Sequence, residues 1–123
     1  MKTILIDTNA LMALVAFKID IFSALERDCD FPFRVAVLQG TLDELEKIQN
    51  EQRGKYARAA KLAFEIAKAK KIPIIKSSGD VDDLLVEYSK KEYLVLTQDV
   101  ELKKRLQKPY LTIRQKRMIV IVN

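Results

Sequence analysis

The sequence contains no histidine, and this absence excludes more chemistry than any other feature of its composition. Without an imidazole there can be no Ser-His-Asp triad, no zinc site that mixes histidine with cysteine, and no histidine acid–base pair. Any catalysis must therefore use carboxylates, metal ions, lysine or hydroxyl groups.

Cysteine, glycine and proline are also scarce. The single cysteine, Cys29, cannot form an internal disulfide, and we expect it to be a small buried apolar residue. With 3 glycines and 3 prolines in 123 residues we expect few flexible linkers, and the length suits one domain over residues 1–123. There is no signal-peptide pattern and no apolar run of membrane-spanning length, so we expect a cytoplasmic protein without a membrane partner.

Short apolar runs alternate with helical patterns along the chain. The predicted strands are 2–7, 34–38, 73–75, 93–97, 110–113 and 118–122. The predicted helices start at residue 8, at 19, at 41, at about 55, after the 77–83 loop and at 100. This alternation predicts a three-layer α/β/α protein, in which helices cover both faces of a mostly parallel sheet of about five strands.

Four acidic residues each follow an apolar run near the start of a predicted helix. They are Asp7, Glu44, Asp82 and Asp99. Because the carboxyl ends of parallel strands open onto one edge of the sheet, these acids are expected to gather there. Clustered carboxylates repel one another, and Mg²⁺ or Mn²⁺, as one or two ions, would remove that conflict. The waters that such an ion retains can supply the nucleophile for phosphodiester hydrolysis.

Each acid also fits a structural role as a helix cap, because unpaired backbone N–H groups at a helix start favour a carboxylate. Thr41 and Glu44 have the spacing of a capping box, in which Glu44 accepts from the backbone N–H of Thr41. Asp80 can cap the helix that carries Asp82. Serine, threonine or asparagine would cap a helix without mutual repulsion, so the presence of four acids favours the metal site.

Basic residues accompany the acids. The net charge is +5, and no acid follows residue 101, which favours a polyanionic partner. The expected RNA contacts are Arg53, Lys55, Arg58, Lys103, Lys104, Arg105, Arg114, Lys116 and Arg117. For the 53–71 segment the alternative is an ordinary solvated helix face. The basic run at 114–117 interrupts two apolar strands without an evident structural need.

Four motifs resemble, in order and spacing, the acidic motifs of PIN domains. They are Ile4–Asn9, Thr41–Leu45, Asp82–Leu85 and Leu96–Asp99. The resemblance covers the whole chain and implies a parallel sheet between helices, with Mg²⁺- or Mn²⁺-dependent endoribonuclease activity on single-stranded RNA. It places Asp7, Glu44, Asp82 and Asp99 on the metal-binding, catalytic acids. The accompanying polar residues are Asn9 and Thr97, and the candidates for supporting the ligands are Asp83, Asp80 and Glu101.

Two branches of that family compete. The 93–106 segment and the 113–117 ending resemble archaeal relatives of an endonuclease that processes small-subunit ribosomal RNA, which implies a precursor rRNA as substrate. The alternative is a VapC-type toxin with an antitoxin partner. A third interpretation is a non-catalytic RNA-binding scaffold in a ribonucleoprotein. A homodimer is also possible, because the apolar residues of the 8–17 segment are either core or a dimer surface.

Overall fold

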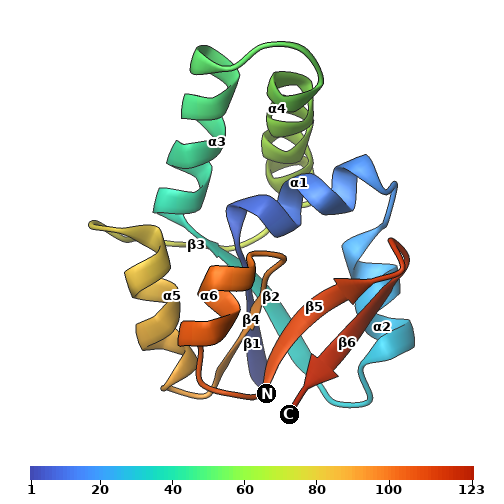
Figure 1. The fold of residues 1–123 in the computed structure, drawn as a ribbon. Helices are drawn as coiled ribbons and strands as arrows, with labels where there is room; N and C mark the ends of the chain where they lie inside the picture. The colour runs from blue at the N-terminus through green and yellow to red at the C-terminus, as the bar shows by residue number, and fades with distance from the viewer.

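Six strands form one sheet in the computed structural model, which describes residues 1–123 (Figure 1). The strands are β1 (Lys2–Ile6), β2 (Phe33–Leu38), β3 (Ile74–Ile75), β4 (Tyr93–Leu96), β5 (Tyr110–Arg114) and β6 (Met118–Val122). The helices are α1 (Thr8–Ala16), α2 (Ile21–Asp28), α3 (Gln39–Glu51), α4 (Gly54–Ala69), α5 (Val81–Ser89) and α6 (Val100–Arg105).

The strand order is β3-β2-β1-β4-β5-β6, and only β6 runs antiparallel to its neighbour. This confirms the predicted α/β class and the mostly parallel sheet. The sheet has six strands rather than about five, because β3, only two residues long, and the β5–β6 hairpin both join it.

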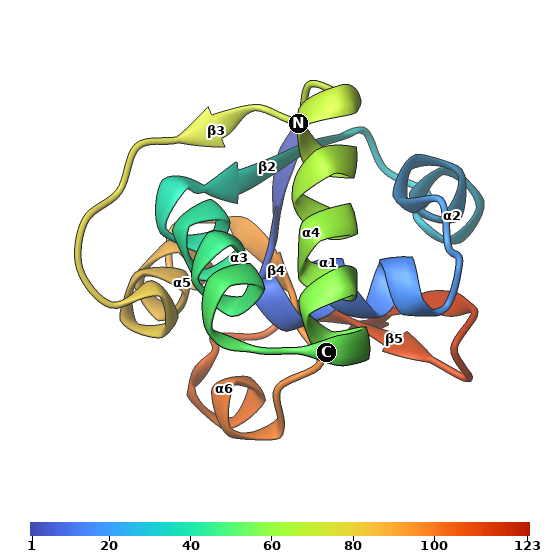
Figure 2. The same ribbon diagram turned by 90° about the horizontal axis from the view of Figure 1, so that it is seen from above.

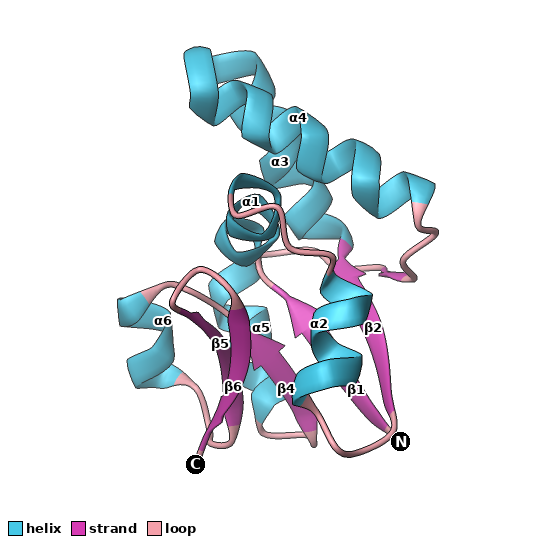
Figure 3. Cartoon of the chain, turned by 90° about the vertical axis from the view of Figure 1, so that its right-hand side faces the viewer, coloured by secondary structure: helices cyan, strands magenta, loops and turns pink.

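Alternation along the central strands sends side chains into two separate cores. In β1, Ile4 and Ile6 belong to a 23-residue cluster with α1 to α4, whereas Leu5 joins a 10-residue cluster with α5 and α6. Figures 2 and 3 show α2 and α5 on opposite sides of the sheet. The α3–α4 pair rises above the carboxyl edge of the sheet (Figure 1).

Most of the apolar side chains of α1 are core. Leu11, Met12 and Leu14 are each at most 5% exposed, which favours the core interpretation of the 8–17 segment over a dimer surface. Cys29 is buried in the same cluster, as expected. No single helix is long and apolar enough to cross a membrane. Only α1 and α2 taken together have the length and composition of a membrane span, and the chain bends by 97° between them.

The basic run at 114–117 does have a structural role, contrary to our expectation. It forms the tight connection between β5 and β6, in which the Arg117 N–H donates to the Arg114 carbonyl at 3.1 Å. Gln115 and Lys116 both have a φ of 54°, as the two central residues of a type I′ turn require. The segment therefore reverses the chain direction between β5 and β6.

The end of α2 packs against this hairpin. The Asp28 carboxylate accepts the Ile119 N–H at 2.8 Å, and the Arg27 guanidinium donates to the Arg117 carbonyl at 2.8 Å. Arg27 and Asp28 also pair with each other at 2.8 Å.

Gln115→Asn is expected to raise the free energy of unfolding by about 0.5–1 kcal/mol, because asparagine tolerates the left-handed conformation better than glutamine. Urea denaturation monitored by circular dichroism measures the change. Gln52→Asn is the matched control, since Gln52 is exposed and has an ordinary φ of −101°. Equal changes in the two variants would contradict the role of backbone strain.

Candidate active site

The four predicted acids lie around one cavity at the carboxyl edge of the sheet. At this edge β1 and β4 are adjacent, and the chain turns to opposite sides of the sheet after these two strands. Ligands of open parallel sheets bind at such a point. The cavity has a volume of about 240 Å³. Its lining residues are Asp7, Thr8, Asn9, Glu44, Ile48, Tyr56, Val81, Asp82 and Asp99.

Asp7 is the most buried of these acids, with only 4% of its surface exposed. One carboxylate oxygen accepts the backbone N–H of Ala10 at 2.7 Å and thereby caps α1, while the other accepts the Thr97 hydroxyl. The pKa of Asp7 is raised to about 6, mainly by burial and also by the charges of Asp82 and Asp99, although these two hydrogen bonds act to lower it.

Thr97 links the first and last acids of the site. It is fully buried, and its hydroxyl donates to Asp7 while accepting the backbone N–H of Asp99 at 3.0 Å. Asp99 in turn caps α6, because one of its oxygens accepts the N–H groups of Glu101 and Leu102 at 2.9 and 3.1 Å. The second Asp99 oxygen takes no part in this cap.

The predicted capping box at Thr41 and Glu44 is wrong. α3 begins at Gln39, directly after β2, so Thr41 is already inside the first turn and cannot occupy the cap position. Its buried hydroxyl has no hydrogen-bond partner. Glu44 therefore lies in the second turn of α3, and its carboxylate accepts the Thr8 hydroxyl at 2.5 Å instead.

Gly40 sets the approach of α3 to α5, and thus of Glu44 to Asp82. A Cβ atom at position 40 would lie 2.7 Å from a Val81 methyl carbon, closer than real contacts permit. The backbone N–H of Gly40 also donates to the Ser77 hydroxyl at 3.0 Å, in the segment that leads into α5.

Asp82 is the acid with the fewest partners. The carboxylate faces the cavity from the first turn of α5, and its pKa is raised by burial and by the charges of Asp99 and Asp80. As expected, Asp80 caps α5 by accepting the Asp83 N–H at 2.9 Å. Asp83 does not cap this helix; its exposed carboxylate pairs with Arg105 at 2.5 Å.

Not every predicted site residue reaches the cavity. Asn9 lines it, but Asp80, Asp83 and Glu101 do not, and Glu101 is an exposed residue that pairs with Lys104 at 3.3 Å. The nine predicted RNA-contacting residues also lie outside it. Of these, Lys103, Lys104 and Arg105 are on α6, whereas Arg114, Lys116 and Arg117 are at the β5–β6 turn. Arg53, Lys55 and Arg58 lie at the start of α4, exposed and outside all ion pairs.

The donor set around the cavity fits a hard divalent cation. All four charged groups are carboxylates, the ligand type that Mg²⁺ and Mn²⁺ prefer. In the side-chain orientations seen, no three of these carboxylates form a group that could hold an ion. Hydrogen bonds from Thr97, Thr8 and backbone N–H groups occupy oxygens of three of the four acids. Binding an ion would therefore require small side-chain rotations.

Two lining residues, Thr8 and Tyr56, were not singled out as site residues from the sequence. Thr8 could be identified as a helix-start residue, but its contact with Glu44 spans 36 residues, so no local pattern reveals it. Tyr56 comes from the start of α4, and only the folded arrangement of α4 beside α1 brings it to the cavity.

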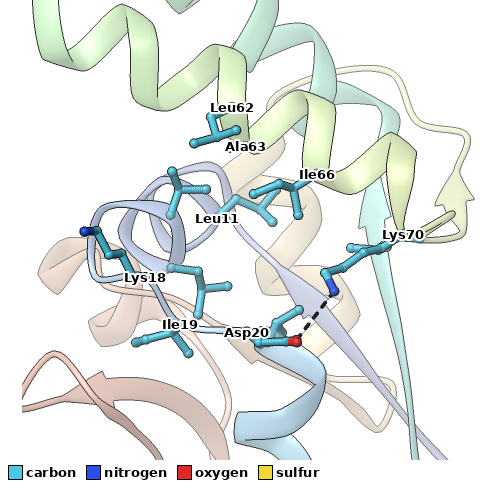
Figure 4. A pocket seen from close by; sticks show the side chains of 12 residues that line it. Leu11, Lys18, Ile19, Asp20, Leu62, Ala63, Ile66 and Lys70 are labelled. Atoms are coloured by element: carbon cyan, nitrogen blue, oxygen red, sulfur yellow. Dashed lines mark ion pairs between the residues drawn. The ribbon is translucent and has the colours of Figure 1, made fainter.

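A second cavity, of about 340 Å³, is lined by none of the four acids, and Figure 4 shows the side chains around it. Leu11, Ile66 and Ile72 are among the mainly apolar side chains that line it, from α1, α2, α4 and the segment after α4. Its one ion pair joins Lys70 and Asp20 at 3.6 Å.

Comparisons with known proteins agree with this arrangement. The family described as PIN like domain matches residues 4–117. Ribonuclease VapC4 of Methanocaldococcus jannaschii is 30% identical over an aligned length of 129 residues. The alignment covers 98% of this chain and 97% of that protein. The structure of the PIN domain endonuclease Utp24 superposes with a TM-score of 0.78 at 25% identity, covering 97% of this chain and 90% of that one.

Gly40→Ala is expected to lower the free energy of unfolding by about 1–2 kcal/mol, because the contact with Val81 outweighs the better helix propensity of alanine. In a Val81→Ala background, which opens the space, the same substitution is expected to be neutral or stabilising. Chemical denaturation of the four proteins measures this coupling. The same loss in both backgrounds would contradict the close approach of the two helices.

Asp7→Asn is expected to stabilise the protein at neutral pH in the absence of divalent ions. The folded state binds the Asp7 proton more tightly than the unfolded state, whose carboxyl titrates near 3.8. In wild type, this tighter proton binding stabilises the fold fully below pH 3.8. The stabilisation is lost as the pH rises to about 6, a change of up to about 3 kcal/mol in the free energy of unfolding.

Urea denaturation of wild type and Asp7→Asn between pH 4 and pH 7.5 measures this difference, which should shrink toward pH 4. Asp20→Asn is the control, because Asp20 caps α2 from an exposed position and should give no such gain. A variant that is less stable than wild type at pH 7.5 would contradict the raised pKa of Asp7.

Proposed function

The chain belongs to the family of PIN-like domains, and from that premise we propose that it is a divalent-metal-dependent endoribonuclease that cleaves single-stranded RNA. The observation that carries the proposal is the convergence of Asp7, Glu44, Asp82 and Asp99 on one cavity. Capping alone does not account for it, since Glu44 caps no helix and Asp82 has no hydrogen-bond donor.

The four carboxylates are the residues that would hold Mg²⁺ or Mn²⁺, as one or two ions. A bound ion of this kind activates water and stabilises the charge that develops on phosphorus. Thr97 and Thr8 orient the carboxylates of Asp7 and Glu44 through their hydroxyl hydrogen bonds. Asp82 and the second oxygen of Asp99 are free to turn toward an ion.

The shape of the site favours a single strand. A cavity of about 240 Å³ in a recess between helices admits one flexible backbone more readily than a rigid duplex. The exposed basic residues at the start of α4 and on α6 lie outside the cavity, where they can neutralise phosphates on either side of the scissile bond.

Two biological roles correspond to the two branches of the PIN-domain family that the sequence resembles. Processing of precursor ribosomal RNA is supported by the resemblance of the 93–106 and 113–117 segments to processing endonucleases. A VapC-type toxin is the alternative, and the similarity to Ribonuclease VapC4 favours it. A small antitoxin gene directly upstream, whose product binds this protein and blocks cleavage, would identify the toxin; its absence would favour processing.

The purified protein is expected to cut a long structured RNA within its single-stranded segments when Mn²⁺ is present, and to lose this activity in EDTA. Asp82→Asn should lower the cleavage rate by more than about 100-fold, beyond the 10- to 100-fold typical of residues that only orient ligands. Gel analysis of end-labelled RNA measures the rate.

Glu87→Gln is the matched control, since it removes an exposed acid of the same helix that lies outside the cavity and pairs only with Lys90. Its cleavage rate should match that of wild type. Full activity of Asp82→Asn, or cleavage that continues in EDTA, would contradict the metal site. RNA that is bound but uncut in every condition would instead support the non-catalytic scaffold.

A further inference from the structure

Tyr56 is an exposed aromatic residue at the mouth of the acidic cavity. Its surface is 49% exposed, and it is the only aromatic among the large apolar residues that the fold leaves exposed. It nevertheless lines the cavity that the four acids share. Single exposed apolar residues are common on protein surfaces, so the informative feature of Tyr56 is its position beside the acids.

A groove continues from this cavity between α1 and α4. It has a volume of about 320 Å³, and Asn9 and Tyr56 line both the cavity and the groove. The remaining wall is mainly apolar, and three of its five residues are alanines. These residues are Met12, Ala13, Ala16, Lys55 and Ala59. The acidic cavity therefore adjoins, at Tyr56, an open and mainly apolar surface groove without any acid.

We propose that Tyr56 is a stacking platform for a nucleobase of the RNA substrate, and that the groove between α1 and α4 receives this base. The inference rests on the proposed function and adds the position of a nucleotide next to the cleavage site. In this arrangement the base lies in the adjoining apolar groove and not in the acidic cavity. In that cavity the carboxylates repel the RNA backbone unless a cation is bound.

The chemistry of the groove matches a nucleotide in two ways. Its apolar walls and its exposed aromatic ring suit the flat face of a base, and stacking of this kind tolerates any of the four bases. Lys55 lies in the groove and Arg53 and Arg58 lie next to it in the sequence; all three are exposed and outside every ion pair. They are therefore available for the phosphates that accompany the base.

The test is the affinity for a fluorescein-labelled single-stranded RNA of mixed sequence, measured by fluorescence anisotropy in EDTA, which stops metal-dependent cleavage. Tyr56→Leu is expected to weaken binding by about 5- to 100-fold, the range that base–aromatic stacking gives. Tyr56→Phe keeps the ring and should bind within about 2-fold of wild type. Leu62→Ala is the control, because Leu62 is a similarly exposed residue of the same helix.

A second probe separates stacking from a general loss of surface. In an RNA of the same length whose nucleotides are abasic, wild type and Tyr56→Leu should bind equally, since only the phosphates remain. Ala16→Leu, at an exposed position of the groove wall, should raise the KM for cleavage without lowering kcat, because it fills the space for the base.

The outcomes distinguish this inference from the proposed function. Wild-type cleavage with unchanged affinity and KM in Tyr56→Leu would overturn the stacking role and leave the nuclease intact; a groove that serves a protein partner would give this result. Equal weakening in Tyr56→Phe and Tyr56→Leu would also overturn it. A protein that never cuts RNA but shows the predicted Tyr56 effects would support stacking while refuting the nuclease.

Discussion

The site depends on how four carboxylates are held around one cavity, with one of them almost fully buried. Asp7 carries the largest cost, because it is almost fully buried and its pKa is raised to about 6. Hydrogen bonds from Thr97 and Ala10 offset part of that cost and fix both oxygens. The fold thus holds an aspartate whose burial favours the neutral form of its carboxyl group.

The arrangement of the sheet explains why the acids meet. The chain leaves β1 and β4 in opposite directions at the centre of the sheet, so that Asp7 and Asp99 follow adjacent strands. Glu44 and Asp82 arrive on α3 and α5, whose starts are in close contact at Gly40 and Val81. The geometry therefore comes from strand order, from the short connections after β1 and β4 that carry Asp7 and Asp99, and from one close helix contact.

Much of this could be predicted from the sequence, and the exceptions have physical reasons. Strand and helix periods identified the α/β sheet, and acids after apolar runs predicted their common edge. The capping box at Glu44 failed because spacing alone does not show where a helix starts, and α3 starts two residues earlier than expected. The roles of Thr8 and Tyr56 depend on contacts between distant segments, which no local pattern contains.

The contact of α2 with the hairpin also has a consequence for the outer boundary of the sheet. β6 is its last strand, five apolar residues without a charge, and such strands readily recruit the same strand of another molecule into fibrils. The Asp28 carboxylate accepts the hydrogen bond of the Ile119 N–H, so that this donor is not available to an incoming strand. The Arg27 hydrogen bond holds the pKa of Asp28 below its usual range, so this gatekeeper stays charged even in mildly acidic solution.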